Sequence, residues 1–192
     1  QGFVNVSPSG GMNLETVEPI YLGKTTPDFT MGWNNNFTYK NFGLSFLINA
    51  RVGGIVTSST QALLDRFGVS KASADARDAG GVMIPNQGLY DAKKYYTLIA
   101  TGENDLAGYY TYSATNVRLQ ELTLSYKFNS RLFNNVIKDL TLSFVATNPW
   151  MIYCKAPFDP ELTASTGTYG QGNDYFMQPS LKSYGFSVKF KF

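Results

Sequence analysis

The end of the chain alternates strictly between two kinds of residue. Residues 181–192 read LKSYGFSVKFKF. Because successive side chains of an extended strand point to opposite sides, this pattern predicts a strand with one aromatic face and one polar face. Such a strand at the edge of a soluble sheet invites aggregation, whereas a strand between lipid and a polar lumen has this composition. The aromatic row is Tyr184, Phe186, Val188, Phe190 and Phe192. An edge strand of a soluble sandwich stays open as the alternative.

Four earlier segments repeat the alternation: residues 28–40, 42–52, 116–128 and 139–148. With the last one, they are between ten and thirteen residues long. Strands that cross a bilayer need about 9–11 residues, whereas strands of globular proteins are usually about 5–6 residues long. Asn35 interrupts the apolar row of the first segment, which predicts a β-bulge there. A tight turn at Lys40–Asn41 predicts that the first two segments form a hairpin.

The connections between these strands alternate in length. Lys40–Asn41 and residues 129–138 are short, whereas residues 53–115 and about 149–180 are long. Outer-membrane barrels have short periplasmic turns and long extracellular loops. In this topology, the short connections and several aromatic residues share the periplasmic rim. Those aromatic residues are Tyr39, Phe42, Phe128, Phe190 and Phe192.

We therefore predict an all-β fold, an antiparallel up-and-down transmembrane β-barrel fragment with long extracellular loops. It would hold five strands, or six with residues 3–6. Closed single-chain barrels of this kind need at least about eight strands. The chain is therefore expected to be the C-terminal part of a larger barrel, which must pair with further chain or with copies of itself.

The long excursion at 53–115 is the segment in which we expect function, because structureless loops of this length are uncommon unless they bind something. Two short helices are predicted at 60–67, ended by Gly68, and at 73–77. A tyrosine-rich run follows, whose rings could stack on sugars or anchor peptides. The candidates for substrate contact are Tyr95, Tyr96, Tyr109, Tyr110 and Tyr112. The alternative is that they pack within the loop or against a lid.

Composition excludes several functions. The chain has no histidine and one cysteine, Cys154, which rules out Ser-His and Cys-His catalysis, the commonest zinc sites and an internal disulfide. We therefore expect that the chain is not an enzyme. The net charge of +2 gives no reason to expect a nucleic-acid partner. There is no apolar run long enough for a transmembrane helix and no signal peptide at Gln1. If the protein is exported, its export signal is expected upstream of this chain.

Polar residues on the opposite face of the strands are expected to solvate the lumen or to contact a plug. They are Asn34, Asn36, Asn49, Arg51, Glu121, Lys127 and Lys189. We expect no cofactor and no firm metal site. Asp159, Glu161 and Asp174 are weak calcium candidates, because calcium takes oxygen ligands. The alternative is that Asp159 and Glu161, on either side of Pro160, set a turn.

Several motifs resemble the C-terminal region of SusC/RagA-type TonB-dependent transporters of Bacteroidetes. The run NVRLQELTLSYKF at 116–128 resembles their R-L-x-x-L-x-L-x-Y segment. Three further features agree in order: Asn148 before Trp150, FDPE at 158–161, and Pro179 leading into SYGFSVKFKF. Upstream, LGKTTPDF at 22–29 and the hairpin FTYKNFGLSF also agree. Asn148-Pro149 departs from the family's usual Asn-Leu and leaves the end of that strand open.

The resemblance implies the outer membrane as the location and a plugged barrel of about 22 strands. Residues 1–192 would be one C-terminal portion of the barrel domain, without the plug. The implied partners are the rest of the barrel and plug, a SusD-like surface lipoprotein, TonB through an N-terminal region, outer-membrane lipid, and a glycan or peptide substrate. Phe192 resembles the aromatic terminus that serves as an insertion signal.

Two other classes of function remain open on the sequence. One is a barrel that does not transport and serves in assembly, anchoring or secretion. The other is a soluble β-rich surface binding module.

Overall fold

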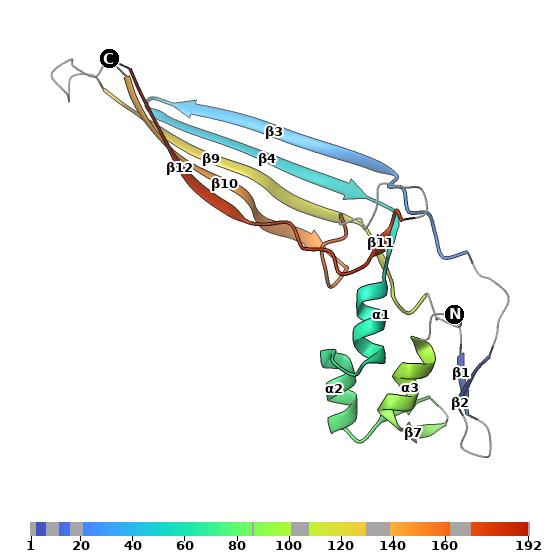
Figure 1. Cartoon of the computed structure of the whole chain (residues 1–192). Coiled ribbons are helices and arrows are strands. Elements are labelled where there is room, and N and C mark those ends of the chain that lie inside the picture. The colour runs from blue at the N-terminus through green and yellow to red at the C-terminus, as the bar shows by residue number, and fades with distance from the viewer. Residues whose placement is uncertain are drawn as a thin grey trace. The chain divides into compact units, whose positions relative to one another are not determined.

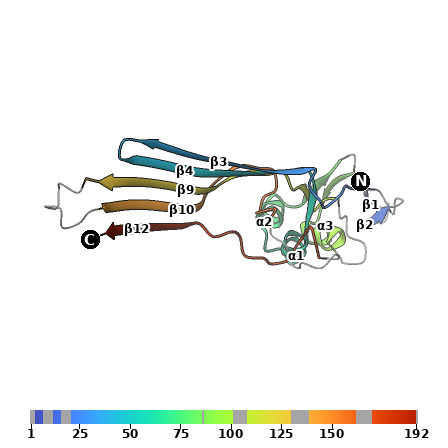
Figure 2. The same ribbon diagram turned by 90° about the horizontal axis from the view of Figure 1, so that it is seen from above.

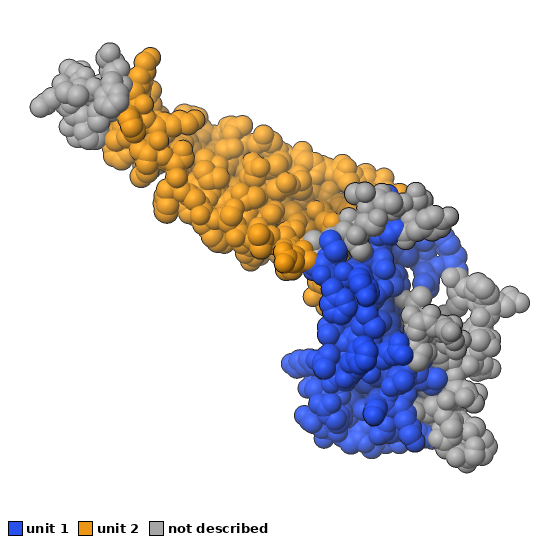
Figure 3. Space-filling model, in the orientation of Figure 1, with its two compact units in different colours: residues 1–25, 55–112, 162–177 blue, residues 26–54, 113–161, 178–192 orange. Residues whose placement is uncertain are grey.

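The computed structural model describes residues 21–85, 87–100, 108–129, 139–161 and 170–191, together with the backbone of 3–6 and 12–15. The chain forms two compact units (Figure 3). We call residues 26–54, 113–161 and 178–192 the sheet unit. We call residues 1–25, 55–112 and 162–177 the helical unit.

The sheet unit is an antiparallel meander of five strands. They are β3 (Phe29–Tyr39), β4 (Phe42–Val52), β9 (Asn116–Phe128), β10 (Asp139–Cys154) and β12 (Ser183–Lys191). Each strand lies beside the next one in the chain, in the order β12-β10-β9-β4-β3 (Figure 2). All four pairings are antiparallel. The predicted up-and-down fold class is confirmed for this unit.

One face of this sheet is apolar across all five strands, apart from Asn35 in β3. The register aligns the apolar rows of all five strands, for example Phe37 with Leu44, Leu44 with Leu124, and Leu124 with Phe144. At one end the rings crowd together: the centroid of the Phe42 ring lies 4.7 Å from that of Tyr126. This face is uncovered, and Phe186 is 78% exposed. An apolar surface of this extent needs a partner, and lipid provides one.

The bulge predicted at Asn35 is wrong. β3 and β4 pair without a break, Asn34 opposite Leu47 and Asn35 opposite Phe46. Asn35 therefore stays in the row that forms the apolar face and points to the same side of the sheet as Trp33. The register shifts lie elsewhere, along β9 and β10.

The strand predicted to end at Asn148 continues to Cys154. Asn148 has a φ of 49°, and the side-chain N–H of Asn148 donates to the carbonyl oxygen of Leu181 at 3.3 Å. Pro149 lacks an N–H to donate. These residues interrupt the ladder with β9, which resumes at Trp150 opposite Leu119. The loop predicted from 149 therefore begins after Cys154.

Residues 3–6 do not form a sixth strand of the meander. β1 (Phe3–Val6) pairs with β2 (Met12–Glu15) in a separate two-stranded sheet. Both strands belong to the helical unit.

The described part of the helical unit contains three helices of eight residues each: α1 (Ser59–Arg66), α2 (Lys71–Asp78) and α3 (Ala92–Ile99) (Figure 1). Its further strands are β5 (Ile55–Ser58), β6 (Val82–Ile84), β7 (Gly88–Tyr90), β8 (Thr111–Ser113) and β11 (Asn173–Asp174). β6 pairs with β7, and β5 lies between β11 and β8. The first two helices confirm the predicted ones, so an all-β description leaves out part of the chain.

Side-chain caps explain where these helices begin. The Ser58 hydroxyl accepts the N–H of Gln61, and the Asp91 carboxylate accepts the N–H of Lys94. Gly68, with a φ of 70°, follows the end of α1. The helix α3 was not predicted, because its two tyrosines favour strands. Its cap at Asp91 was the available sign.

No helix within the described residues has the length and hydrophobicity to span a membrane.

Among the described residues, the core of the helical unit is a cluster of six. It consists of Ala62, Ala92, Tyr96, Ile99, Ala100 and Tyr110. The helix α3 contributes its buried face through residues spaced at helical intervals, Ala92, Tyr96 and Ile99. Two of the tyrosines named as candidates for substrate contact are therefore core residues.

Candidate functional site

The strongest polar cluster in the sheet unit depends on an extra residue in β9. Leu47 lies opposite Glu121 and Ile48 opposite Leu119, so Gln120 is the bulged residue. A bulge of one residue reverses which side chains face each side of the sheet. On the C-terminal side of Gln120, Glu121 lies on the polar face. On its N-terminal side, Arg118 lies on that same face, opposite Asn49. The side-chain N–H of Asn49 donates to Gln120 Oε1.

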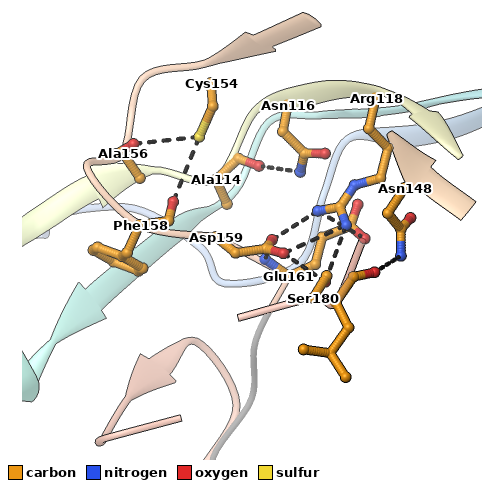
Figure 4. A network of polar contacts seen from close by, with 11 residues as sticks. Ala114, Asn116, Arg118, Asn148, Cys154, Ala156, Phe158, Asp159, Glu161 and Ser180 are labelled. Atoms are coloured by element: carbon orange, nitrogen blue, oxygen red, sulfur yellow. Dashed lines mark hydrogen bonds and ion pairs between the residues drawn. The ribbon is translucent and has the colours of Figure 1, made fainter. Parts of the chain in front are cut away.

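Arg118 is buried, 5% exposed, and lies among acceptors from a distant part of the chain (Figure 4). Its Nη2 lies 2.7 Å from Asp159 Oδ1 and 3.3 Å from Glu161 Oε2. Its Nη1 donates to the Ser180 hydroxyl at 3.2 Å. The Ser180 hydroxyl in turn donates to Asp159 Oδ2 at 2.6 Å. The network joins β9 to both ends of the segment that connects β10 with β12.

The charges in this network compensate one another. Burial by itself raises the pKa of Asp159, but hydrogen bonds from Arg118, Ser180 and the backbone N–H of Glu161 lower it, so that it lies below its ordinary value. Asp159 is therefore a carboxylate at neutral pH. A buried ion pair between a guanidinium and a carboxylate is costly to break, because removal of one partner leaves the charge of the other uncompensated.

The turn after β10 is held by a further set of contacts. The Cys154 thiol donates to the carbonyl oxygens of Ala156 and Phe158, at 3.4 Å and 3.6 Å (Figure 4). The Glu161 N–H donates to Asp159 Oδ1 at 3.1 Å. Asp159 and Glu161 therefore shape this turn, as the sequence-based alternative proposed, and both are engaged by Arg118.

The three calcium candidates belong to different units. Asp159 and Glu161 contact Arg118 in the sheet unit. Asp174 lies in the helical unit, where it accepts a hydrogen bond from the Ser58 hydroxyl at 2.7 Å. Within the described ranges, no group of three or more acidic, cysteine or histidine side chains is arranged to hold a metal ion. The expectation of no cofactor and no firm metal site, with these residues as weak calcium candidates, stays a prediction.

The tyrosine candidates divide into buried and accessible residues. Tyr110 is 1% exposed and donates to Asp65 at 3.1 Å, and Tyr96 is buried beside it in the core. Burial raises the pKa of Tyr96 to about 12, with Tyr109 and Asp65 adding to the effect, and burial also raises the pKa of Tyr110. Both tyrosines are therefore neutral. A ligand cannot reach either ring in this structure.

Tyr95, Tyr109 and Tyr112 remain candidates for substrate contact. Tyr109 is 48% exposed, and its ring meets that of Tyr110 edge-on at 5.0 Å. Tyr95 and Tyr112 are half-buried. Tyr109 thus has an exposed ring that packs against the buried ring of Tyr110.

Sequence reasoning missed a second exposed aromatic group, next to β11. Phe176 has a φ of 49°, a conformation that is strained for a bulky residue, yet it is 56% exposed. Its N–H donates to the Thr60 hydroxyl at 2.6 Å. The ring of the exposed Tyr175 meets it edge-on at 5.4 Å. Strained residues gather at functional positions, which makes this pair a candidate surface for binding.

The predicted lumen residues share the polar face of the sheet. Asn34 and Glu121 lie in one row across Leu47, and Asn36 lies in the next row with Ser45. Lys127 and Lys189 both lie opposite Thr141. The remaining two, Asn49 and Arg51, lie at the far end of β4, opposite Arg118 and Asn116. Lys127 is also paired with Asp139 at 2.8 Å. Their contact with a lumen or plug stays a prediction, and Phe192 lies outside the described residues.

Comparisons with known proteins agree on one kind of fold. No protein-family model matches the chain. TonB-dependent receptor P3 of Formosa agariphila is 25% identical over 189 residues, which are 95% of this chain and 18% of the relative. The RagAB peptide importer in its open-open state matches with a TM-score of 0.67 and 17% identity, over 99% of this chain and 20% of the matched chain. Its closed-closed state matches with a TM-score of 0.57 at the same identity. The chain spans about a fifth of the length of these proteins.

Replacement of Arg118 by methionine is expected to destabilise the segment between β10 and β12. The change leaves two carboxylates, one of them buried, without their cation, a loss of about 3–5 kcal/mol. In the full-length protein, limited proteolysis should cut residues 155–182 faster than in the parent. Lys182→Met, at an exposed position, is the control. Equal cleavage of the Arg118→Met variant and the control would contradict this role.

The same segment is expected to loosen at acidic pH. Because the folded pKa of Asp159 lies below the ordinary value of about 3.9, its stabilisation is complete above that pH and is lost as pH falls through the folded pKa. Hydrogen exchange of peptides containing Asp159, corrected for the intrinsic rate, should show protection falling below about pH 4. Asp159→Asn should show weaker protection at neutral pH and a flatter profile. An unchanged profile in that variant would sink this assignment.

Proposed function

We propose that this chain, which is a SusC/RagA-type segment of a TonB-dependent receptor of the Bacteroidetes outer membrane, is part of an importer of peptides or glycans. The sheet unit supplies five strands of the barrel wall. The observation that carries the proposal is the two-faced meander, with its uncovered apolar surface on one side and its polar residues on the other. The likeness to a receptor and to the RagAB peptide importer supports it.

TonB is the proposed source of energy for import. The likeness to a TonB-dependent receptor supports this part of the proposal. The contact with TonB would be made by a part of the receptor outside these 192 residues. The relatives are named as a receptor and an importer, which fits a protein that moves a substrate without changing it.

A SusD-like surface lipoprotein is the proposed partner of the helical unit. Large apolar side chains of this unit are exposed, among them Phe67 at 73% and the pair Tyr175 and Phe176. Exposed apolar groups of this size are typical of protein-binding surfaces. The hydrogen bonds of Ser59 to Asn173 and of Thr60 to Phe176 hold the aromatic pair in place. A fixed aromatic surface loses little entropy on binding.

Peptides are the substrate class that the likeness to a peptide importer favours. Tyr109 offers a flat face for an apolar side chain and a hydroxyl for a backbone group. The same ring could stack on a sugar, so glycans are the alternative outcome of the test below. Tyr95 and Tyr112 would contribute secondary contacts.

We expect Tyr109→Ala to lower uptake by a receptor that is otherwise correctly inserted. The loss of one aromatic contact corresponds to about 0.5–1.5 kcal/mol, a reduction of roughly two- to tenfold. Uptake of labelled oligopeptides and oligosaccharides by cells that carry the full-length receptor measures it. Tyr109→Phe keeps the ring and should retain most uptake, whereas Tyr21→Ala, at a more exposed tyrosine of the same unit, should change nothing.

The same cells test the transport function itself. Removal of TonB should abolish uptake of whichever substrate is imported. Uptake that persists without TonB, or an outer-membrane receptor that imports neither class of substrate, would contradict the proposed function. If TonB is required but Tyr109→Ala has no effect, only the role of Tyr109 fails.

A further inference from the structure

We call the apolar face of the sheet its outward face and the polar face its inward face. Among the described residues, the outward face is apolar or aromatic at every regularly paired position except one. Along β4, for example, the row runs from Phe42 through Phe46 to Val52, and along β12 from Tyr184 to Phe190. The exception is Asn35, in the middle of β3. Polar residues that face the membrane are rare and by default carry a function.

Aromatic rings surround this amide. Asn35 lies opposite Phe46. The Phe46 ring meets Trp33 edge-on at 5.7 Å and stacks on Phe37 at 6.1 Å, so it bridges the two outward neighbours of Asn35 along β3. The Nδ2 atom of Asn35 is buried and has no hydrogen-bond partner among the described residues. The side chain as a whole is half-buried.

An unpaired amide is unfavourable in hydrocarbon, because no water is there to accept its hydrogen bonds. Inside membranes, asparagine side chains commonly pair with polar groups of a neighbouring segment. On the β4 side of Asn35, the facing position is taken by Phe46. On its other side, β3 pairs with no strand of the described chain. A partner can therefore approach the half-buried side chain from the open edge, and the buried amide nitrogen meets it by turning about the last side-chain bond.

We propose that Asn35 forms a hydrogen bond, within the membrane, to a polar side chain on the strand that pairs with the open edge of β3. That side chain is the amide or hydroxyl of an asparagine, glutamine, serine or threonine, and it faces outward opposite Asn35. Cross-strand neighbours of this kind have Cβ atoms about 4.5–5.5 Å apart, within reach of such a bond.

The occupant is a strand of the same polypeptide. The proteins that resemble this chain are about five times as long, and a closed barrel leaves no strand edge unpaired. The bond would fix the register of that strand, since a slip by one residue turns its polar side chain to the opposite face. This inference concerns the barrel wall and does not depend on which substrate is imported.

Folding of the full-length receptor tests the proposal. Asn35→Leu should lower the ratio of folded to unfolded barrel in urea by roughly three- to tenfold, because the partner is left unpaired in lipid. Folding into lipid vesicles, followed by the gel shift of folded barrels, measures it. Asn35→Thr replaces the amide with a hydroxyl, which can still donate or accept a hydrogen bond, and should fall between the parent and the leucine variant. Met31→Leu, outward on the same strand, is the matched control and should match the parent.

The opposite sign of the effect would overturn the proposal. If Asn35 faces lipid without a partner, leucine removes an unfavourable amide, and the variant folds as well as the parent or better. An equal loss in Met31→Leu would also overturn it. If Asn35→Leu yields no folded barrel, recovery in Asn35→Thr supports the bond and its failure there refutes it. If the Asn35→Leu variant folds normally but its assembly has lost the mass of a bound protein, Asn35 contacts that protein and the proposal is wrong.

Discussion

The sheet unit depends on the contrast between its two faces. Each strand presents mainly apolar side chains to one side and mainly polar side chains to the other, with Asn35 as the exception on the apolar side, and the register keeps the rows aligned across all five strands. Neither face can be exchanged for the other without placing charges in lipid or rings in water. The membrane is thus the solvent that this sheet requires on its apolar side.

The bulge at Gln120 is the one place where β9 reverses this alternation, and the polar cluster depends on it. It turns Arg118 to the polar face, where Asp159, Glu161 and Ser180 meet it. One guanidinium thereby holds the point at which the chain leaves the sheet after β10 and the point at which it returns to β12. The intervening residues contribute β11 to the helical unit, so this unit is assembled from separate excursions of the chain.

Alternation in the sequence was enough to predict most of the sheet. β4 and β9 have the predicted bounds, and β3 differs by one residue at each end. The pattern of one strand does not show which residues of the next strand lie opposite it. The sequence therefore predicts a bulge at Asn35, where the pairing is regular, and does not predict the bulge at Gln120. The change of parity between Leu119 and Leu122 was its available sign. Which tyrosines face a core also depends on tertiary packing, so the sequence leaves substrate contact and packing within the loop both open for Tyr96 and Tyr110, and the structure places both in the core.

The face assignment is tested most directly by single cysteines, introduced in turn at neighbouring positions of the full-length protein in lipid vesicles and labelled with a fluorophore. Fluorophores at outward positions such as Leu124 and Leu142 should be quenched by nitroxide lipids. Fluorophores at their inward neighbours, Thr123 and Thr141, should be quenched by a water-soluble quencher instead. Quenching by the aqueous agent at both sets of positions, or by lipid at the inward set, would contradict the assignment of this sheet to a barrel wall.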